Sequence, residues 1–324
     1  MQETKRTKVV TVGGGSGQFA LLKALKGIEN IDITAIVAMS DSGGSTGVLR
    51  DEFGELPTGD VLKCLIALSP LKDARTLFQT RFSAEKLKNH NAGNMLMIFL
   101  SQYLGRDFAQ AINAMSEILK IKGKVLPVTT DKTTLVAKLE NGKLLFGETV
   151  IDVVQGTREE KIVETMLVPH AGRLEVYPPV LDALKEADYI LIGPGDFYTS
   201  IIPNLLVPKV VETIKDSKAK LVYILNLMTK YGETNGFTAY DFVTKLESYI
   251  KCEVHTVLAN STKLDYDIST KYEKEKAKQV VVSNKEEWGS RSLKFFDLLY
   301  EGTIVRHDSR KLKAAIEELM NEEK

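Results

Sequence analysis

The chain has 324 residues, and its 43 lysines and arginines balance its 43 aspartates and glutamates, so the formal net charge is zero. With 44% hydrophobic and 27% charged residues, its composition is that of a globular protein and excludes the disordered and collagen-like classes. Because there is no excess of positive charge, we expect neither nucleic acid nor an anionic membrane as a partner. Any site for an anion must therefore be local.

Short runs of β-branched and aliphatic residues recur along the chain and predict the strands of a sheet that is buried on both faces. The predicted strands are residues 8–12, 33–38, 125–128, 189–192, 220–225, 254–258 and 279–282. Helical periodicity follows most of them and is clearest over residues 18–25, 205–215, 239–250 and 308–320. This alternation predicts an α/β class fold that is Rossmann-like and doubly wound, with a mostly parallel sheet.

Two segments interrupt the alternation of strand and helix. Residues 60–120 have the pattern of several successive helices, which indicates a helical insertion. Residues 134–154 contain two strand patterns, 134–139 and 143–150, around Asn141-Gly142, which predicts a β-hairpin with a type I′ turn. Since no linker or repeat separates these parts, we favour a single Rossmann-like domain over residues 1–324 to two independent domains.

A glycine-rich loop follows the first predicted strand and precedes a helix. It contains Gly13, Gly14, Gly15, Ser16 and Gly17. The glycines allow a tight turn and close approach of a phosphate, whose charge the free N–H groups of the helix N-terminus would bind. Continued to Ala20, the loop has the G-x-G-x-x-G/A form of dinucleotide sites, whereas the absence of a Lys-Ser/Thr pair excludes a Walker A loop. A tight turn without a ligand is the alternative.

A second loop of small residues ends the second predicted strand. It contains Ser40, Asp41, Ser42, Gly43 and Gly44. Asp41 is placed to bind a ribose diol, as the acid of a dinucleotide site does, or to hold Mg²⁺ together with Asp60. For Asp60 a role as a helix N-cap is an equal alternative.

A third glycine-rich loop follows the strand 189–192. Its candidate ligand-binding residues are Gly193, Pro194, Gly195, Asp196, Tyr198 and Thr199, and Asn226 and Thr229 follow the next strand. The carboxyl ends of parallel strands lie at one edge of a sheet, where open α/β sheets bind ligands close to the point at which strand order reverses. We therefore expect these loops to share one site.

The remaining candidate residues are less specific. His90 precedes a predicted helix. A position in the ligand cleft and a purely structural role are equally favoured for it. Arg306 is one of the cations that a phosphate ligand would require. Cys64 and Cys252 lack the spacing of a zinc site or a disulfide framework, and no apolar stretch reaches the roughly 20 residues that span a bilayer. Together with the absence of a signal peptide, these features indicate a cytoplasmic protein without a membrane span.

Seven ordered motifs resemble those of the gluconeogenesis factors of the YvcK type, which are similar in fold to 2-phospho-L-lactate transferase, the CofD-like enzymes. These motifs are GGGSG at 13–17, SDSGGSTG at 40–47, PTGD at 57–60, HNAGN at 90–94, GPGDFYTSIIPNLLV at 193–207, NLMTKYGETNGF at 226–237 and RHD at 306–308. The resemblance covers nearly the whole chain and adds Asn94 to the candidate ligand-binding residues. It implies a UDP-sugar ligand such as UDP-N-acetylglucosamine and a regulatory role in cell shape and envelope synthesis during gluconeogenic growth, without an established reaction.

The transferase branch suggests an alternative function. Residues that resemble its metal-binding acids are Asp41 and Asp60, which makes them the catalytic and metal-binding candidates of a metal-dependent transferase of phosphorus-containing groups. An NADP-like dinucleotide is a further candidate ligand, and a homodimer is left open. The sequence departs from its relatives at Tyr231, near which they have Pro, and at Phe242, near which they have His.

Overall fold

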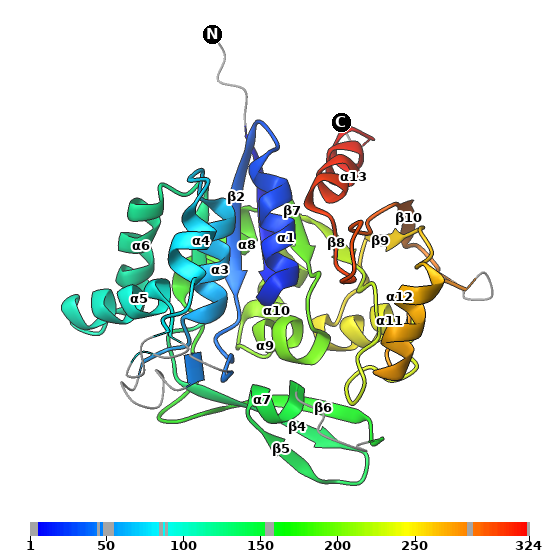
Figure 1. Ribbon diagram of the computed structural model, residues 1–324, viewed down its shortest axis with the longest axis horizontal. Coiled ribbons are helices and arrows are strands. Elements are labelled where there is room, and N and C mark those ends of the chain that lie inside the picture. Colours follow the sequence, from blue (N-terminus) through cyan, green and yellow to red (C-terminus); the bar gives the residue numbers. More distant parts are fainter. Residues whose placement is uncertain are drawn as a thin grey trace.

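The computed structural model describes residues 6–43, 46–47, 55–83, 87, 90–152, 159–283 and 288–322 (Figure 1). Within these residues a seven-stranded sheet has the order β10-β9-β8-β7-β1-β2-β3, and every neighbouring pair is parallel. Its strands are β1 (Thr7–Gly13), β2 (Ile31–Val37), β3 (Lys124–Pro127), β7 (Tyr189–Ile192), β8 (Lys220–Ile224), β9 (Thr256–Asn260) and β10 (Ser292–Phe296). The α/β, Rossmann-like prediction is confirmed.

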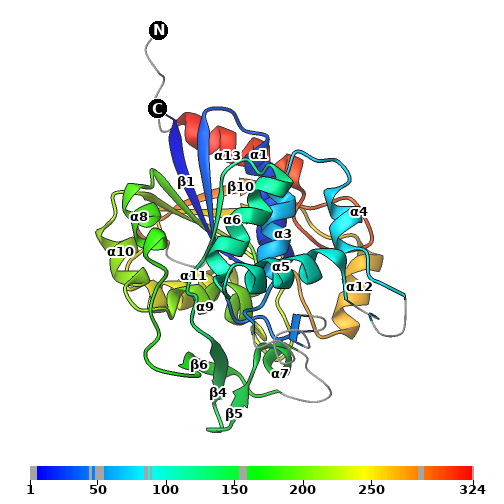
Figure 2. The same ribbon diagram turned by 90° about the vertical axis from the view of Figure 1, so that its left-hand side faces the viewer.

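Helices cover both faces of this sheet (Figures 1 and 2). In the first half of the chain they are α1 (Gly15–Lys26), α3 (Gly59–Leu68), α4 (Ala74–Gln79), α5 (Ala92–Tyr103), α6 (Phe108–Leu119) and α7 (Glu148–Asp152). In the second half they are α8 (Pro178–Glu186), the π-helix η2 (Phe197–Ile201), α9 (Ile202–Leu205), α10 (Val210–Asp216), α11 (Ala239–Ile250), α12 (Tyr266–Lys274) and α13 (Ser309–Glu322). Among the described residues, no helix is both long and apolar enough to cross a membrane.

Strand order reverses between β1 and β7. From β1 the chain moves outward to β2 and β3, then returns to the other side of β1 and continues outward through β7, β8, β9 and β10. The central strands are continuous apolar runs, and Val9, Val10 and Val12 of β1 are at most 2% exposed. The helices on the two faces bury these strands, so the loops at their carboxyl ends are held on a rigid core.

The last predicted strand was wrong. Gln279 forms only an isolated bridge to Met228, and residues 280–282 are not in a strand. The seventh strand is instead β10, whose edge position gives it the mixed burial that sequence patterns detect poorly. The prediction of one continuous helix over residues 205–215 was also wrong. The segment contains two helices, because the chain is not helical between Leu205 and Val210, around Pro208.

A small antiparallel sheet of three strands lies below the main sheet in Figure 1. It has the order β5-β4-β6, with β4 (Thr133–Leu139), β5 (Leu144–Phe146) and β6 (Ile162–Pro169). The type I′ turn was wrong, because Gly142 has a positive φ of 84° whereas Asn141 does not. The Gly142 N–H donates to the Leu139 carbonyl (2.9 Å), as in a three-residue hairpin loop. The predicted second strand ends early, since residues 148–152 form α7.

Helices α3 to α6 lie in the segment from residue 59 to residue 119, where the sequence indicated a helical insertion. The single-domain organisation of residues 1–324 stays a prediction.

Candidate functional site

A cavity of about 790 Å³ lies at the carboxyl edge of the sheet, where strand order reverses. Its inner wall is formed by the loop after β1 and the loop after β7, and Asn226 from the end of β8 also lines it. The segment that leads into α13 forms the outer wall, with Tyr300 and Arg306. A cavity at this position is where open α/β sheets bind their ligands.

The glycine loops are built for close approach of backbone to backbone. Gly15 begins α1 with a positive φ of 65°, which favours glycine. A Cβ atom at Gly17 would lie 2.3 Å from the carbonyl oxygen of Pro194, so the loops after β1 and β7 touch there. The N–H groups of Ser16 and Gly17, in the first turn of α1, have no intrahelical acceptor and are available to an anion, whereas the Gly15 N–H donates to the Asp60 carboxylate.

Two buried amide side chains hold these loops in place. The Asn204 Nδ2 group donates to the carbonyls of Gly13 (3.0 Å) and Ser200 (2.9 Å), which ties the end of β1 to η2. The Gln18 Nε2 group donates to Thr11 Oγ1 (3.0 Å) and to the Ile36 carbonyl (2.9 Å), which joins α1 to β1 and β2. Neither residue was predicted from the sequence, since its role depends on distant carbonyls.

Asp60 contacts the first glycine loop directly. Its Oδ2 accepts a hydrogen bond from the Gly15 N–H (2.8 Å), and its Oδ1 lies 2.9 Å from Lys63 Nζ. The N-cap of α3 is Thr58, so the alternative that Asp60 is a helix N-cap was wrong. Asp60 instead links α3 to the N-terminus of α1.

Asp41 lies next to Asp60 in the structure. Its Oδ1 accepts a hydrogen bond from the Gly43 N–H (2.8 Å), and a Cβ atom at Gly59 would lie 2.6 Å from its Oδ2. Burial, followed by the charges of Asp60 and Glu148, raises the pKa of Asp41 to about 6. A buried carboxyl group whose pKa is raised by a neighbouring carboxylate is typical of sites that bind a cation or exchange a proton.

A second group of charges lies beside this pair. Lys230 Nζ forms ion pairs with Asp152 at the end of α7, with Asp196 (3.0 Å) and with Glu233 (3.1 Å). Desolvation, followed by the charges of Glu233, Glu148 and Asp60, raises the pKa of Asp196 to about 7, whereas its 50% exposed side chain and its pairing with Lys230 favour the charged form. From the sequence, Lys230 was interpreted as a surface cation although it lies in the motif at 226–237, and Glu148 was not selected because no local pattern marks it.

The donors around Asp41 and Asp60 fit a magnesium ion in part. Mg²⁺ in phosphate sites is usually held by one or two carboxylates together with phosphates of the substrate. Asp41 and Asp60 supply the carboxylates and repel one another, which a cation would relieve. In the part of the chain that is described, no three His, Cys, Asp or Glu side chains form a metal-binding group by themselves. A metal at this point would need ligand oxygens.

The predicted ligand-binding residues divide into two groups. Those that line the cavity are Gly14, Gly15, Ser16, Gly17, Pro194, Gly195, Asp196, Asn226 and Arg306. Those described but not lining it are Gly13, Ser40, Asp41, Ser42, Gly43, Asp60, His90, Asn94, Gly193, Tyr198, Thr199 and Thr229. Gly44 lies outside the described residues.

Several members of the second group have other partners. The Tyr198 hydroxyl, fully buried, donates to the carbonyl of Ile162 in β6 (3.3 Å). Thr229 Oγ1 accepts from the Lys278 N–H (2.9 Å). Asn94 is buried in the first turn of α5, where its N–H donates to Asn91 Oδ1 (2.8 Å). In this structure the Tyr198 and Thr229 side chains therefore join segments that are distant in the chain, and the Asn94 backbone completes the N-cap of α5.

The segment before α13 contributes an aromatic and cationic wall. The Arg306 guanidinium lies over the ring of Tyr300, 4.1 Å from its centroid. The adjacent His307 is buried, with its Nε2 3.1 Å from the Leu225 carbonyl, and burial lowers its pKa to about 4. His307 therefore anchors this wall to the end of β8 as a neutral imidazole.

The two positions at which a departure from the relatives was expected lie in the packing around the cavity. Phe242 is fully buried and packs against the rings of Phe197 (5.7 Å) and Phe237 (5.2 Å). Tyr231 accepts a hydrogen bond from Lys276 Nζ (3.0 Å), which also lies over its ring. Neither residue lines the cavity, so both belong to the packing around it.

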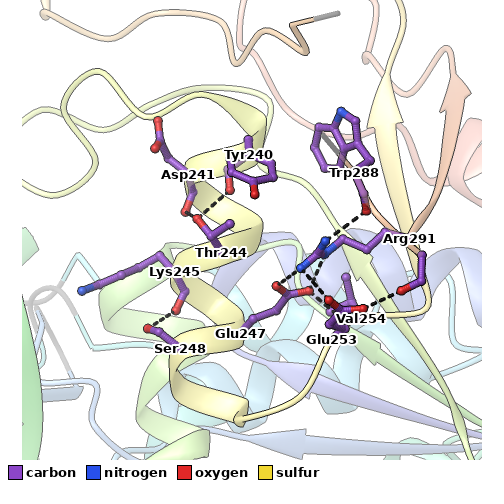
Figure 3. A network of polar contacts seen from close by, with 11 residues as sticks. Tyr240, Asp241, Thr244, Lys245, Glu247, Ser248, Glu253, Val254, Trp288 and Arg291 are labelled. Carbon is purple, nitrogen blue, oxygen red and sulfur yellow. Dashed lines mark hydrogen bonds and ion pairs between the residues drawn. The ribbon is translucent and has the colours of Figure 1, made fainter. Parts of the chain in front are cut away.

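A separate polar network, shown in Figure 3, lies on α11 away from the cavity. Arg291 donates from Nε and Nη2 to the two carboxylate oxygens of Glu247 (2.8 and 2.6 Å) and from Nη1 to the Trp288 carbonyl (3.0 Å). The Trp288 ring also packs edge-on against Tyr240. These contacts fix the start of β10 on α11.

Comparison with known proteins agrees with this geometry. Residues 9–295 match the family model described as "2-phospho-L-lactate transferase CofD". The chain is 37% identical to the gluconeogenesis factor of Bacillus subtilis, over 98% of this chain and 99% of the relative. It is 40% identical to the gluconeogenesis factor of Listeria innocua, over 81% of this chain and 80% of the relative.

A solved structure has the same fold. The crystal structure of a member of the UPF0052 family from Bacillus halodurans superimposes with a TM-score of 0.89 at 36% identity, covering 97% of this chain and 99% of that one. The arrangement of loops around the cavity therefore belongs to a fold that a homologous chain also adopts.

Proposed function

Because this chain belongs to the family of 2-phospho-L-lactate transferase CofD, and its curated relatives are gluconeogenesis factors, we propose that it is a regulatory protein that binds a nucleotide sugar. The ligand class is a UDP-sugar of the UDP-N-acetylglucosamine type. Its proposed role is in the gluconeogenic growth state, through cell shape and envelope synthesis, in the cytoplasm. The observation that carries the proposal is the contact of two glycine loops around the N-terminus of α1.

The diphosphate is the part of the ligand for which the support is greatest. The first turn of α1 offers N–H groups and the positive end of the helix dipole. The loop after β7 can lie directly against this turn because Gly17 has no side chain. There is no room for one beside the Pro194 carbonyl. A diphosphate needs such backbone donors, and those of Ser16 and Gly17 lie beside the Gly15 N–H, which Asp60 already occupies.

The sugar and the nucleoside have complementary surfaces in the same cavity. Carboxylates accept hydrogen bonds from hydroxyl groups, and Asp196 lies at the inner wall. The Tyr300–Arg306 pair and the apolar side chains of Phe19 and Ile304 line the outer part and offer surfaces for a flat base. A ligand with a polar sugar, two phosphates and a base matches this distribution.

The alternative function is a transferase that uses a metal and a nucleotide-activated substrate. The adjacency of Asp41 and Asp60 favours it, because a divalent cation held there would stabilise negative charge that develops on a transferred phosphoryl group. In that reaction, Lys63 would keep Asp60 oriented while Asp60 holds the Gly15 N–H.

Calorimetric titration tests the proposal against the alternative. UDP-N-acetylglucosamine, UDP, NADP and GTP would each be titrated with and without Mg²⁺, and the recovered ligands separated by chromatography. We expect micromolar binding of UDP-N-acetylglucosamine and recovery of the intact ligand. Absence of uridine nucleotide binding would contradict the proposal.

The variant Asp60→Asn separates the two functions. Asparagine can still accept the Gly15 N–H bond but carries no charge for a metal or for Lys63. If a ligand is converted in the presence of Mg²⁺ and the conversion is lost in Asp60→Asn, the transferase function replaces the regulatory one. Lys218→Gln, at an exposed position outside the cavity lining, is the control.

A further inference from the structure

The cavity extends along α1, beyond the glycine loops. Ser16, Phe19, Ala20 and Lys23 all line it, and their spacing of three, four and seven residues places them on one face of the helix. Eight residues separate Gly15 from Lys23, which corresponds to about 12 Å along the helix axis. The floor of the cavity therefore continues for two turns past the donors that would bind a diphosphate.

The short helix α4 forms one side of this extension. Arg75 and Gln79, four residues apart, both line the cavity. The Arg75 guanidinium lies over the ring of Phe19, 5.2 Å from its centroid, and its Nε donates to Gln79 Oε1 (3.2 Å). In Figure 1, α4 lies on one side of α1 and the segment leading into α13 on the other. The extension is thus a groove over α1, which we call the α1–α4 groove.

The cations of the groove differ from Lys63 and Arg310, two of the other cations that line the cavity, whereas Arg306 stacks on Tyr300. Lys63 is paired with Asp60, and Arg310 lies 3.6 Å from Asp308. For Lys23 and Arg75, no Asp or Glu among the described residues lies within ion-pair distance. Stacking on Phe19 limits the orientations of the Arg75 guanidinium, whose terminal nitrogens can bind two oxygens of one anion. Lys23, one turn beyond Phe19 on the same face of α1, adds a second positive charge to the cavity lining.

We propose that Lys23 and Arg75 form a second anion subsite, which binds a phosphate group between one and two turns of α1 away from the glycine loops. The subsite deepens the proposed function, since it assigns a second phosphate to the same cavity. The phosphate belongs either to an extended ligand or to a separate small molecule. Lys23 supplies charge, and Arg75 supplies charge and paired donors.

Titration with inorganic phosphate tests the subsite, in the ligand-free protein and in the protein saturated with UDP. We expect phosphate to bind in both, and the double variant Lys23→Gln/Arg75→Gln to weaken this binding about tenfold, the loss that corresponds to removal of charge-assisted hydrogen bonds. UDP affinity should change less than about twofold in that variant. Arg75→Lys keeps the charge but not the paired donors. Its affinity for phosphate should lie between that of the parent protein and that of the double variant.

The matched control is Lys72→Gln/Lys218→Gln. It removes the same charge from two exposed positions that do not line the cavity, and should leave phosphate binding unchanged. Three outcomes would overturn the subsite: no phosphate binding, displacement of UDP by phosphate, or unchanged phosphate binding in the double variant. If UDP fails to bind, the proposed function fails, while the titration of the ligand-free protein still decides whether the subsite exists.

A comparison of NADP with NAD identifies the source of the phosphate. A preference for NADP that disappears in Lys23→Gln/Arg75→Gln supports a second phosphate on the same extended ligand. Equal affinities for the two dinucleotides, together with phosphate binding beside UDP, support a separate molecule.

Discussion

The charged groups of α11 and those of the cavity differ in how well they are paired. At α11, Arg291 binds Glu247 through two hydrogen bonds, and both side chains are about 10% exposed, at 10% and 11%. Beside the cavity, Asp41 lies next to Asp60, and the charges of Glu233 and Glu148 raise the pKa of Asp196. Lys63 pairs with Asp60, and Lys230 is shared between Asp196 and Glu233, so the carboxylates there outnumber their cations. Paired charges hold two elements together, whereas crowded carboxylates store an unfavourable energy that a cation or a proton can relieve.

Loss of the Arg291–Glu247 pair should have the largest effect. In Arg291→Met, Glu247 keeps a buried carboxylate without its cation, so we expect a loss of about 3–5 kcal/mol in the free energy of unfolding. Urea denaturation measures this loss. Nucleotide affinity of the folded variant should be unchanged, because neither residue lines the cavity.

The control is Glu247→Leu/Arg291→Met, in which the lone charge is removed as well. This double variant should recover more than half of the lost stability. A loss below about 1 kcal/mol in Arg291→Met would show that the pair does not hold β10 on α11.

Gly17→Ala tests the contact between the glycine loops. The new Cβ would lie 2.3 Å from the Pro194 carbonyl, so the loops must separate, at a cost of about 1–3 kcal/mol in stability. Since the separated loops no longer present one anion site, UDP affinity should fall by more than about tenfold, measured by calorimetry.

Gly27→Ala is the matched control for this change. Gly27 has a negative φ, and a Cβ atom added there would lie 3.4 Å from its nearest neighbours, which is close to ordinary contact. The affinity of Gly27→Ala for UDP should equal that of the parent protein. Equal affinity in Gly17→Ala would remove the argument for a shared phosphate site.

Asp41→Asn should stabilise the protein. The folded-state pKa of Asp41 is raised to about 6 from an ordinary value of 3.8, so the folded state favours the protonated form. The protonated side chain therefore makes its full contribution to the free energy of unfolding below pH 4, and this contribution is lost as the pH rises through 6. At pH 8, asparagine removes the unfavourable charge and should add about 2 kcal/mol.

Thermal denaturation at pH 4 and at pH 8 checks this sign. The melting temperature of Asp41→Asn should exceed that of the parent at pH 8 by a few degrees and match it at pH 4. A destabilised variant at pH 8 would mean that Asp41 is paired in the folded state, as Glu247 is.

The smallest expected effect is a dependence of nucleotide affinity on pH in the absence of Mg²⁺. As the pH rises from 5 to 8, Asp41 and Asp196, whose pKa values are raised to about 6 and about 7, lose their protons and repel a diphosphate. We expect the affinity for UDP to fall roughly fivefold over this range and the fall to be weaker with Mg²⁺. Calorimetric titrations at each pH measure it, and a pH-independent affinity would place the diphosphate away from the carboxylates.

Much of the architecture was predictable from local sequence. The apolar runs of β1, β2, β7 and β8 are buried on both faces and therefore have an unambiguous pattern. Edge strand β10 was not found, because its residues alternate weakly and are partly exposed. Residues 279–282 were favoured instead for their apolar composition, which does not correspond to a strand.

The site was predictable in part. The glycine loops at 13–17 and 193–195 follow clear strands, and their conformations depend on local backbone geometry. Glu148 and Arg75 were not predictable as parts of the cavity or its surroundings, because each comes from a segment with no pattern of its own. Lys230 lies in the motif at 226–237, but a lysine after a strand is by itself typical of a surface cation. Tyr198 was selected as a ligand-binding residue, yet its hydroxyl is directed to β6.

The sequence by itself determined that the chain forms a parallel α/β sheet with glycine loops after its central strands, because strand periodicity and glycine conformation are local properties. Only the tertiary structure decided which loops meet. The order of strands sets Gly17 against Pro194 and Asp41 beside Asp60, and the helices that cover the sheet bring Arg75 over Phe19. Such contacts join residues far apart in the chain, and their geometry follows from packing the whole core.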